Sequence, residues 1–133
     1  MTEAPHTIGH DQTLAAAHRM MHKHSIRHLP VLDAGKLVGI LSLRDLHFIE
    51  TLKDIDQEQV QVSEAMSPDV FAIGPRSSLR KVAAEMAEQR YGSAIVIDNG
   101  RVVGIFTTVD ALTALSSLLD EQRPVEARAT SHD

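Results

Sequence analysis

The stretch VGILSLRD, residues 38–45, runs from apolar residues into the pattern Ser-x-x-Asp, and the same order of residue types returns as VGIFTTVD at residues 103–110. A Ser or Thr three residues before an acidic residue is typical of a capping box at a helix N-terminus. Such an N-terminus also attracts anions, because its first backbone N–H groups have no partner within the helix. Each stretch is therefore a candidate for a helix cap, a ligand site or both.

The two stretches belong to an internal repeat. When the chain is compared with itself at a shift of 65 residues, the halves align without a gap. The identical pairs include Met1 and Met66, Ile8 and Ile73, Gly9 and Gly74, Leu14 and Leu79, Met21 and Met86, Val31 and Val96, Asp33 and Asp98, Gly39 and Gly104, and Asp45 and Asp110. Gene duplication is the natural interpretation, and it predicts two structural units of one design.

Each unit has the same predicted order of elements. After a short extended piece, apolar residues at helical spacing follow Thr13 and Ser78, which are plausible N-caps. The runs HLPVLD and SAIVID then pass through Ala-Gly and Asn-Gly into KLVGILS and RVVGIFT. Asn-Gly between two apolar runs is a strong hairpin signal. A second helix is expected from about residue 44 to 52 and from about 110 to 119.

The predicted fold class is α/β (α+β), with the order β-α-β-β-α occurring twice. A unit of this size is marginal alone, because small domains bury too little surface. We therefore expect the units to pack about a pseudo-twofold axis, with two equivalent clefts near it. The predicted organisation is a first repeat at 1–52, a polar linker at 53–62, a second repeat at 63–119 and a solvated tail at 120–133.

Composition excludes several classes of function. The 133 residues carry a formal net charge of −5 and only 3% aromatic residues, so neither a basic surface nor a stacking platform for nucleic acid is expected. The chain has no apolar run of 18 or more residues, so no membrane segment is expected. It contains no Cys, which excludes disulfides and fits a reducing compartment. The expected location is the cytoplasm.

Two quoted segments carry a resemblance to a known family. AMSPDVFAIGPRSSL at residues 65–79 and AIVIDNGRVVGIFTTVDAL at residues 94–112 resemble the pattern of the CBS-domain pair, often called a Bateman module. The first unit repeats the pattern with MTEAPHTIGHDQTL and HLPVLDAGKLVGILSLRDL. The resemblance covers roughly residues 1 to 119. It implies a regulatory module that binds an adenosine-containing ligand, such as AMP, ADP, ATP, NAD or S-adenosylmethionine, between its repeats.

The resemblance assigns the ligand to the repeated Ser/Thr-x-x-Asp pattern. Ser42 and Thr107 would lie where a helix N-terminus favours an anion, and Asp45 and Asp110 would accept hydrogen bonds from ribose hydroxyls. By spacing alone, a capping box is an equally good interpretation. A capping box prefers Glu or Gln at its last position, and both copies carry the shorter Asp, which favours a ligand role for at least one.

Basic residues distinguish the two units. Arg27 and His28 occupy the positions that correspond to Gly92 and Ser93, and Arg44 adds a third cation beside the first aspartate. In the family, basic residues at this position reach ligand phosphates, and clustered cations in an acidic chain attract phosphate. A solvated basic patch is the alternative. The two clefts are expected to differ in charge.

The adenine base is expected against apolar residues. The family lays adenine against the strand that here holds Thr7 with Ile8 and Ala72 with Ile73, opposite Pro30 and Ile95. An ordinary core position is the alternative for each of these. No aromatic clamp is expected in either cleft, although Tyr91 is a candidate to approach one.

No metal and no catalytic chemistry are expected. His18 and His22 have the i, i+4 spacing of zinc ligands, but no Asp or Glu at matching spacing completes the set. The sequence has no GxSxG, HExxH, GxxxxGK or GxGxxG motif, so it is not expected to be an enzyme.

The resemblance implies a homodimer formed by exposed helices, and a regulated enzyme or transporter as partner. Apolar candidates for the dimer face are Leu46, Phe48, Ile49, Leu52, Leu112, Leu115, Leu118 and Leu119. The competing hypothesis is a structural oligomerisation module without a functional ligand.

Overall fold

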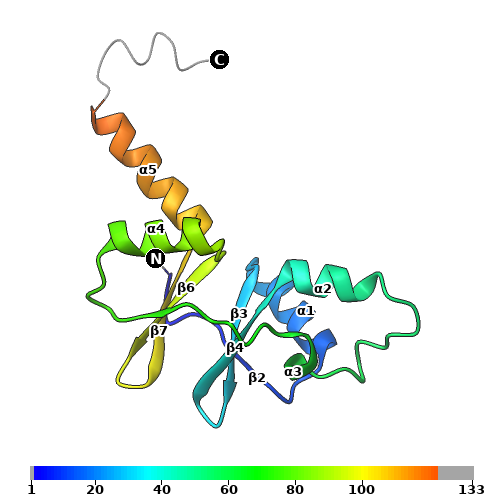
Figure 1. Ribbon diagram of the computed structural model, residues 1–133. Coiled ribbons are helices and arrows are strands. Elements are labelled where there is room, and N and C mark those ends of the chain that lie inside the picture. Colours follow the sequence, from blue (N-terminus) through cyan, green and yellow to red (C-terminus); the bar gives the residue numbers. More distant parts are fainter. Residues whose placement is uncertain (1, 123–133) are drawn as a thin grey trace, which may run out of the picture.

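The computed structural model describes residues 2–122 and contains two sheets, each with its own helices (Figure 1). The three-stranded sheet has the order β2 (Ile8–Gly9), β3 (His28–Asp33), β4 (Lys36–Ser42). The four-stranded sheet has the order β1 (Thr2–Glu3), β7 (Arg101–Thr107), β6 (Ser93–Asp98), β5 (Ala72–Ile73). Their hairpins lie side by side, with both turns at the lower edge of the view (Figure 1). The predicted α/β class and the duplicated β-α-β-β-α order are confirmed.

The first repeat follows the predicted pattern closely. Its elements are β2 (Ile8–Gly9), α1 (Leu14–His24), β3 (His28–Asp33), β4 (Lys36–Ser42) and α2 (Leu43–Glu50). The Thr13 hydroxyl accepts a hydrogen bond from the Ala16 amide at 3.1 Å, so the predicted N-cap of α1 is confirmed. Helix α2 ends two residues before the expected position.

The second repeat contains β5 (Ala72–Ile73), α4 (Leu79–Gln89), β6 (Ser93–Asp98), β7 (Arg101–Thr107) and α5 (Thr108–Gln122). Ser78 caps α4 as predicted, and Asn99 and Gly100 have φ values of 52° and 77° in the hairpin turn. The sequence placed the end of the second helix near Leu119 and a solvated tail from Asp120. Helix α5 continues three residues further, to Gln122, because acidic and amide residues tolerate a helix there. The remaining tail, 123–133, lies outside the described residues.

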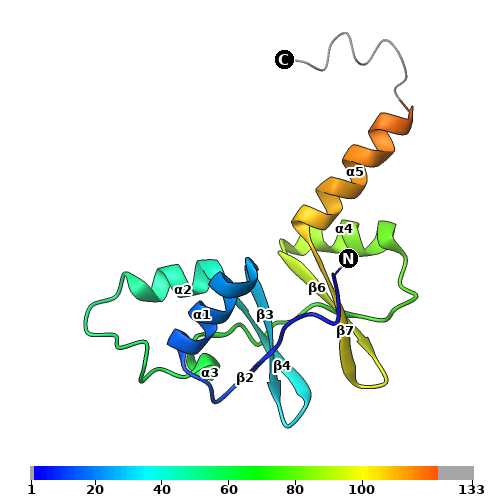
Figure 2. The same ribbon diagram turned by 180° about the vertical axis from the view of Figure 1, so that it is seen from behind.

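Two short elements were not predicted. Helix α3 (Val62–Ala65) lies within the lead-in to the second repeat, and β1 (Thr2–Glu3) pairs antiparallel with β7. Strand β1 therefore belongs to the sheet of the second repeat, although in the sequence it lies at the start of the first. The view from behind follows this crossing from the N-terminus to β2 (Figure 2).

The crossing is reciprocal. Thr2 lies opposite Ile105 in β7, and Ser67 lies opposite Ile40 in β4. The shift of 65 residues converts the first pair into the second, so each repeat's lead-in pairs with the other repeat's hairpin. Strands β4 and β7 also contact each other at the junction. This reciprocal pairing supports the expected pseudo-twofold arrangement.

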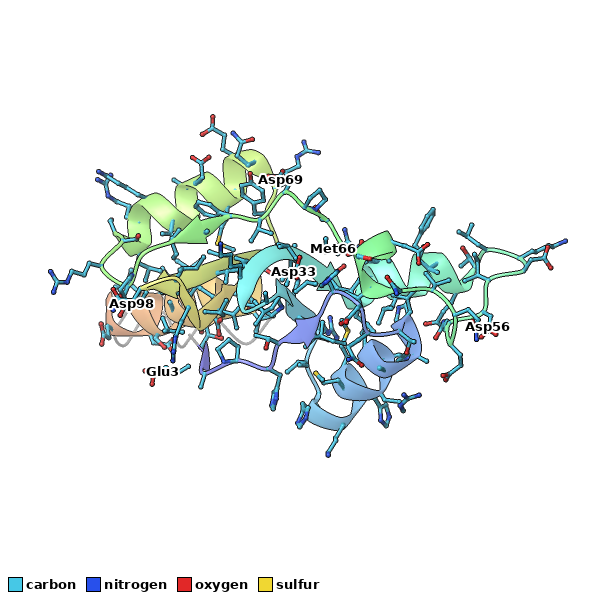
Figure 3. The ribbon with its side chains drawn as sticks, turned by 90° about the horizontal axis from the view of Figure 1, so that it is seen from below. Glu3, Asp33, Asp56, Met66, Asp69 and Asp98 are labelled. Atoms are coloured by element: carbon cyan, nitrogen blue, oxygen red, sulfur yellow. The ribbon has the colours of Figure 1, made fainter. Side chains whose placement is uncertain are left out.

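The reciprocal pairing explains one of the repeated glycines. A Cβ on Gly39 would lie 2.9 Å from the Ser67 carbonyl oxygen and would overlap the Met66 thioether. Met66 lies where the chain leaves α3 for the second repeat (Figure 3). Gly39 therefore allows the second repeat's lead-in to approach β4 closely.

The two cores differ in size. The buried core of the first repeat joins α1, the hairpin and α2 through Leu14, Met21, Leu29, Leu41, Leu46 and their neighbours. The second repeat has a smaller buried cluster of Val82, Met86, Ala94 and Phe106. Within residues 2–122, no helix is both long enough and apolar enough to span a bilayer.

Candidate functional site

Both Ser/Thr-x-x-Asp stretches form capping boxes. At α2 the Ser42 hydroxyl accepts from the Asp45 amide at 3.0 Å, and Asp45 Oδ2 accepts from the Ser42 amide at 3.0 Å. At α5 the Thr107 amide donates to Asp110 Oδ2 at 2.8 Å, and the Asp110 amide donates to the Thr107 hydroxyl at 3.3 Å. The short Asp side chain closes both boxes, so its length is no argument against capping. The capping interpretation is confirmed at both helices.

The caps leave capacity for a ligand at α2. The box engages Oδ2 of Asp45, so Oδ1 can accept a further hydrogen bond, and the Ser42 hydroxyl proton can be donated. Both residues are half-buried. A cap and a ligand contact are thus compatible at the same residues.

Each helix start is tied to the first strand of its hairpin. The Leu43 amide donates to the Arg27 carbonyl oxygen at 2.8 Å, and the Thr108 amide donates to that of Gly92 at 3.2 Å. Within the hairpins, His28 lies opposite Ser42 and Ser93 lies opposite Thr107. The two predicted sites are therefore built from corresponding residues: the beginning of one strand, the end of the next and the first turn of a helix.

His28 lies at the contact between the repeats. The position of a Cβ on Gly92 is 3.4 Å from His28 Nε2, so a first-repeat side chain reaches the second repeat at a residue without a side chain. Burial lowers the pKa of His28, and the charge of Arg27 acts in the same direction, whereas the nearby Asp45 carboxylate opposes the shift. The structure thus brings His28, Ser42 and Asp45 together beside the second repeat.

The predicted cations differ in exposure. Arg27 and Arg44 are exposed, whereas His28 is half-buried. The corresponding residues of the second repeat are exposed Gly92, exposed Val109 and buried Ser93. The first repeat therefore has two arginines and a histidine at positions where the second repeat has no basic residue, and contact of these three side chains with a ligand stays a prediction.

The residues expected to contact adenine differ in their exposure. Ile8 is only 4% exposed and packs within the first-repeat core, and Ile73 packs against the second-repeat core. Thr7 is half-buried and Ala72 is exposed. Ala72 pairs with Ile95 in the parallel β5–β6 register. A core role is confirmed for Ile8, and contact of the four residues with a base stays a prediction.

Tyr91 is engaged within its own repeat. Its ring stacks on Phe71 with centroids 5.0 Å apart, and its hydroxyl donates to Asp69 Oδ1 at 3.3 Å. Burial raises the pKa of Tyr91, and the Asp69 carboxylate adds to the effect. The aromatic pair closes one side of the small second-repeat core.

The histidines of α1 have partners that spacing alone did not reveal. His18 Nδ1 lies 3.4 Å from Glu50 Oε1, and its ring meets that of His47 edge-on. His18 and His22 also line a surface hollow with Ala15, Arg19 and Gln57. Among residues 2–122, no three His, Cys, Asp or Glu residues are grouped so as to hold a metal ion. The contact with Glu50 joins α1 to α2, and no signal in the local sequence points to it.

Comparison with known proteins identifies the family. The sequence profile described as "CBS domain" matches residues 1–48 and 62–117. The CBS domain-containing protein YhcV of Bacillus subtilis is 31% identical over 110 residues, which cover 83% of this chain and 78% of that protein. Inosine-5'-monophosphate dehydrogenase of Korarchaeum cryptofilum is 29% identical over 105 residues, which cover 78% of this chain but only 21% of that enzyme.

Solved structures share the fold over most of the chain. AcuB from Vibrio cholerae has a TM-score of 0.78 and 33% identity, covering 94% of this chain and 93% of that one. The CBS domain pair of protein MJ0100, solved with 5'-methylthioadenosine and S-adenosyl-L-methionine, has a TM-score of 0.75 and 28% identity, covering 87% and 92%. Hypoxic Response Protein I, solved with two coordinated zinc ions, has a TM-score of 0.73 and 26% identity, covering 85% and 92%.

Proposed function

The chain is a tandem pair of CBS domains, and on this premise we propose that it is a regulatory module that binds an adenosine-containing ligand between its repeats. The observation that carries the proposal is the cluster of Ser42, Asp45 and His28 beside the second repeat. The adenosyl compounds in the MJ0100 complex support this class of ligand.

We assign the ligand to the cleft of the first capping box. A ribose would bond to Asp45, because a carboxylate accepts strong hydrogen bonds from hydroxyl groups. The N-terminus of α2 and the Ser42 hydroxyl would face an anionic group. Arg27 and Arg44 are exposed and can approach a phosphate there. The cleft of Thr107 and Asp110 lacks these cations and would bind a neutral or cationic adenosyl compound better.

We assign the base to the edge formed by Thr7 and Ile8 or by Ala72 and Ile73, one edge in each repeat. The parallel β2–β3 and β5–β6 pairings place these residues beside the apolar hairpin strands. Thr7 and Ala72 would contact the base directly, because they have accessible atoms, and Ile8 would support the edge from within the core.

Occupancy would be passed on by movement of the repeats within a homodimer. His28 already contacts the second repeat, so a ligand that engages Asp45 would act close to the inter-repeat contact. A regulated enzyme or transporter is the proposed recipient, in line with the small share of the dehydrogenase that this chain matches. The module itself is proposed to be non-catalytic, without a metal cofactor, and cytoplasmic.

Thermal unfolding with AMP, ATP, NAD and S-adenosylmethionine tests the proposal. A ligand at 100 times its Kd stabilises the folded state by about 2.7 kcal/mol, which raises the Tm by several degrees. We expect at least one compound to do so. No rise with any of the four would favour the competing function, a structural oligomerisation module. The capping boxes support this alternative, because both aspartate carboxylates already accept hydrogen bonds from backbone amides of the protein itself.

A further inference from the structure

The segment between β1 and β2, residues 4–7, crosses from the sheet of the second repeat to that of the first, and we call it the strap (Figure 2). At one end of the strap, the Ala4 amide donates to the Val103 carbonyl oxygen at 3.1 Å. Thr7, at the other end, is half-buried and is one of the residues proposed to contact the base. A movement of the strap would therefore affect both the junction of the repeats and the ligand edge of the first repeat.

One side chain of the strap docks on the first helix. The His6 ring stacks on the ring of His24, with centroids 3.7 Å apart and planes inclined by 16°. His24 is the last residue of α1 and is half-buried, whereas His6 is exposed. The two imidazole rings thus fasten the strap to the end of α1.

The second repeat has a stacked pair at the corresponding place. At the shift of 65 residues, His6 corresponds to Phe71, whose ring stacks on Tyr91 with centroids 5.0 Å apart. Tyr91 follows the end of α4 closely, so this pair also joins a lead-in to the end of its repeat's first helix. Phenylalanine does not titrate, and burial raises the pKa of Tyr91 further above neutrality. The same fastening is therefore built from titratable rings in the first repeat and from rings that stay neutral in the second.

Protonation would open the histidine pair. Two neutral imidazole rings stack favourably, whereas two imidazolium rings at this separation repel each other. Burial lowers the pKa of His24, and the charges of His6 and Lys23 act in the same direction. The C-terminal end of α1 opposes them, because the helix dipole favours a cation there. A state in which the strap has left α1 would thus bind protons at a higher pH than the docked state does, so acid favours release.

Two other histidine contacts of the first repeat respond to acid in the opposite sense. His10 Nε2 lies 3.3 Å from Asp33 Oδ1. His18 Nδ1 lies 3.4 Å from Glu50 Oε1. Protonation strengthens contacts of this kind, since it turns them into charge-assisted pairs. Acid would therefore loosen the strap while it strengthens these two contacts elsewhere in the repeat.

We propose that the His6–His24 pair is an acid-released latch: protonation of the rings frees the strap from α1 and withdraws Thr7 from the ligand edge. The regulatory part rests on the proposed function, because it names the proton as a second effector of the same site. Adenosyl ligands would bind more weakly as the pair becomes protonated, and a bound ligand would in turn keep the pair neutral.

Hydrogen exchange of the full chain without ligand tests the latch. From about pH 7.5 to about pH 5.5, one unit on either side of the ordinary histidine pKa, the protection factor of residues 4–10 should fall. The expected fall is about tenfold or more, the signature of local opening. His6→Phe introduces the residue found at the corresponding position of the second repeat and should abolish the fall. His22→Phe, at an exposed position of α1, is the matched control and should retain it.

The lead-in of the second repeat, residues 69–74, is the reference within the same protein and should keep its protection at both pH values. An equal fall in wild type and His6→Phe, or no fall in wild type, would overturn the latch. If His6→Phe does not fold, His24→Gln takes its place, because Gln89 occupies the corresponding position. This variant should show low protection of residues 4–10 at both pH values, and a retained fall would overturn the latch.

Calorimetric titration with S-adenosylmethionine and with NAD at the same two pH values tests the regulation. On acidification, the Kd of the wild-type protein is expected to rise by about fivefold more than that of His6→Phe does. Both proteins keep His28, so its titration cancels in the comparison. An equal rise in the two proteins would overturn the regulation. Absence of binding by both compounds at the higher pH would overturn the proposed function, whereas the exchange experiment needs no ligand and shows separately whether the latch fails.

Discussion

Ser67 and Ile40 exchange two backbone hydrogen bonds of 2.9 Å, although one opens the second repeat and the other lies within the first. The pair joins the repeats through main-chain atoms, and Thr2 with Ile105 repeats the arrangement at the other junction. A substitution that disturbs either pairing is therefore expected to lower the stability of both repeats.

Gly39→Ala is expected to destabilise the protein by about 1–3 kcal/mol, because the added methyl group would overlap Met66 and the Ser67 carbonyl oxygen. Chemical denaturation measures the loss. Gly74→Ala is the matched control, since the nearest atom to its Cβ position is 4.0 Å away. Equal stability of the two variants would contradict a close approach at Gly39.

Ser42→Ala is expected to cost about 1 kcal/mol of stability, because it removes the oxygen that accepts from the Asp45 amide. Thr13→Ala removes an equivalent cap from α1 and should cost a similar amount. Only Ser42→Ala should also reduce the thermal shift given by ligand. If both variants reduced that shift equally, the loss would reflect general destabilisation and Ser42 would have no ligand role.

Stability is expected to fall as pH falls below the ordinary histidine pKa of about 6.5, in part through His28. Burial and Arg27 hold the pKa of His28 below the ordinary value of 6.5, and Asp45 opposes them only in part. The unfolded chain therefore binds its proton at a higher pH than the folded chain does. The stability that neutral His28 contributes is present above the unfolded pKa and is lost as pH falls through the folded pKa.

Urea denaturation at several pH values tests this linkage. His28→Gln should flatten the dependence between the unfolded and folded pKa values of His28. The exposed His22→Gln variant is the matched control on α1. A dependence that is unchanged in His28→Gln, or reduced equally in both variants, would refute the role of His28.

Local patterns predicted most of the secondary structure. Asn99 and Gly100 adopt the two positive φ angles of their turn, and Thr13 and Ser78 cap their helices, because these preferences depend on a few adjacent residues. The pairing of Thr2 with Ile105 was missed, because two residues carry no periodicity and the partner strand is distant in the sequence. The end of α5 was missed because its last residues tolerate a helix without burying an apolar face.

The candidate site was predictable in its residues and less so in its geometry. The duplicated pattern identified Ser42, Asp45, Thr107 and Asp110, and the structure places each pair at the start of a helix. The sequence could not show that His28 reaches Gly92, because that contact depends on how the two repeats pack. The bond between His18 and Glu50 was likewise hidden, since it joins separate helices.

Calorimetric titration with the compound that gives the largest thermal shift tests the central claim most directly. It compares the wild-type protein with Asp45→Ala and Asp110→Ala, and with Thr13→Ala as a variant that loses a cap only. For a phosphate-bearing ligand, Asp45→Ala is expected to raise the Kd at least tenfold, and by more than Asp110→Ala does, while Thr13→Ala stays near the wild-type value. A wild-type protein that binds none of the four compounds, or a Kd that Asp45→Ala leaves unchanged, would contradict the account.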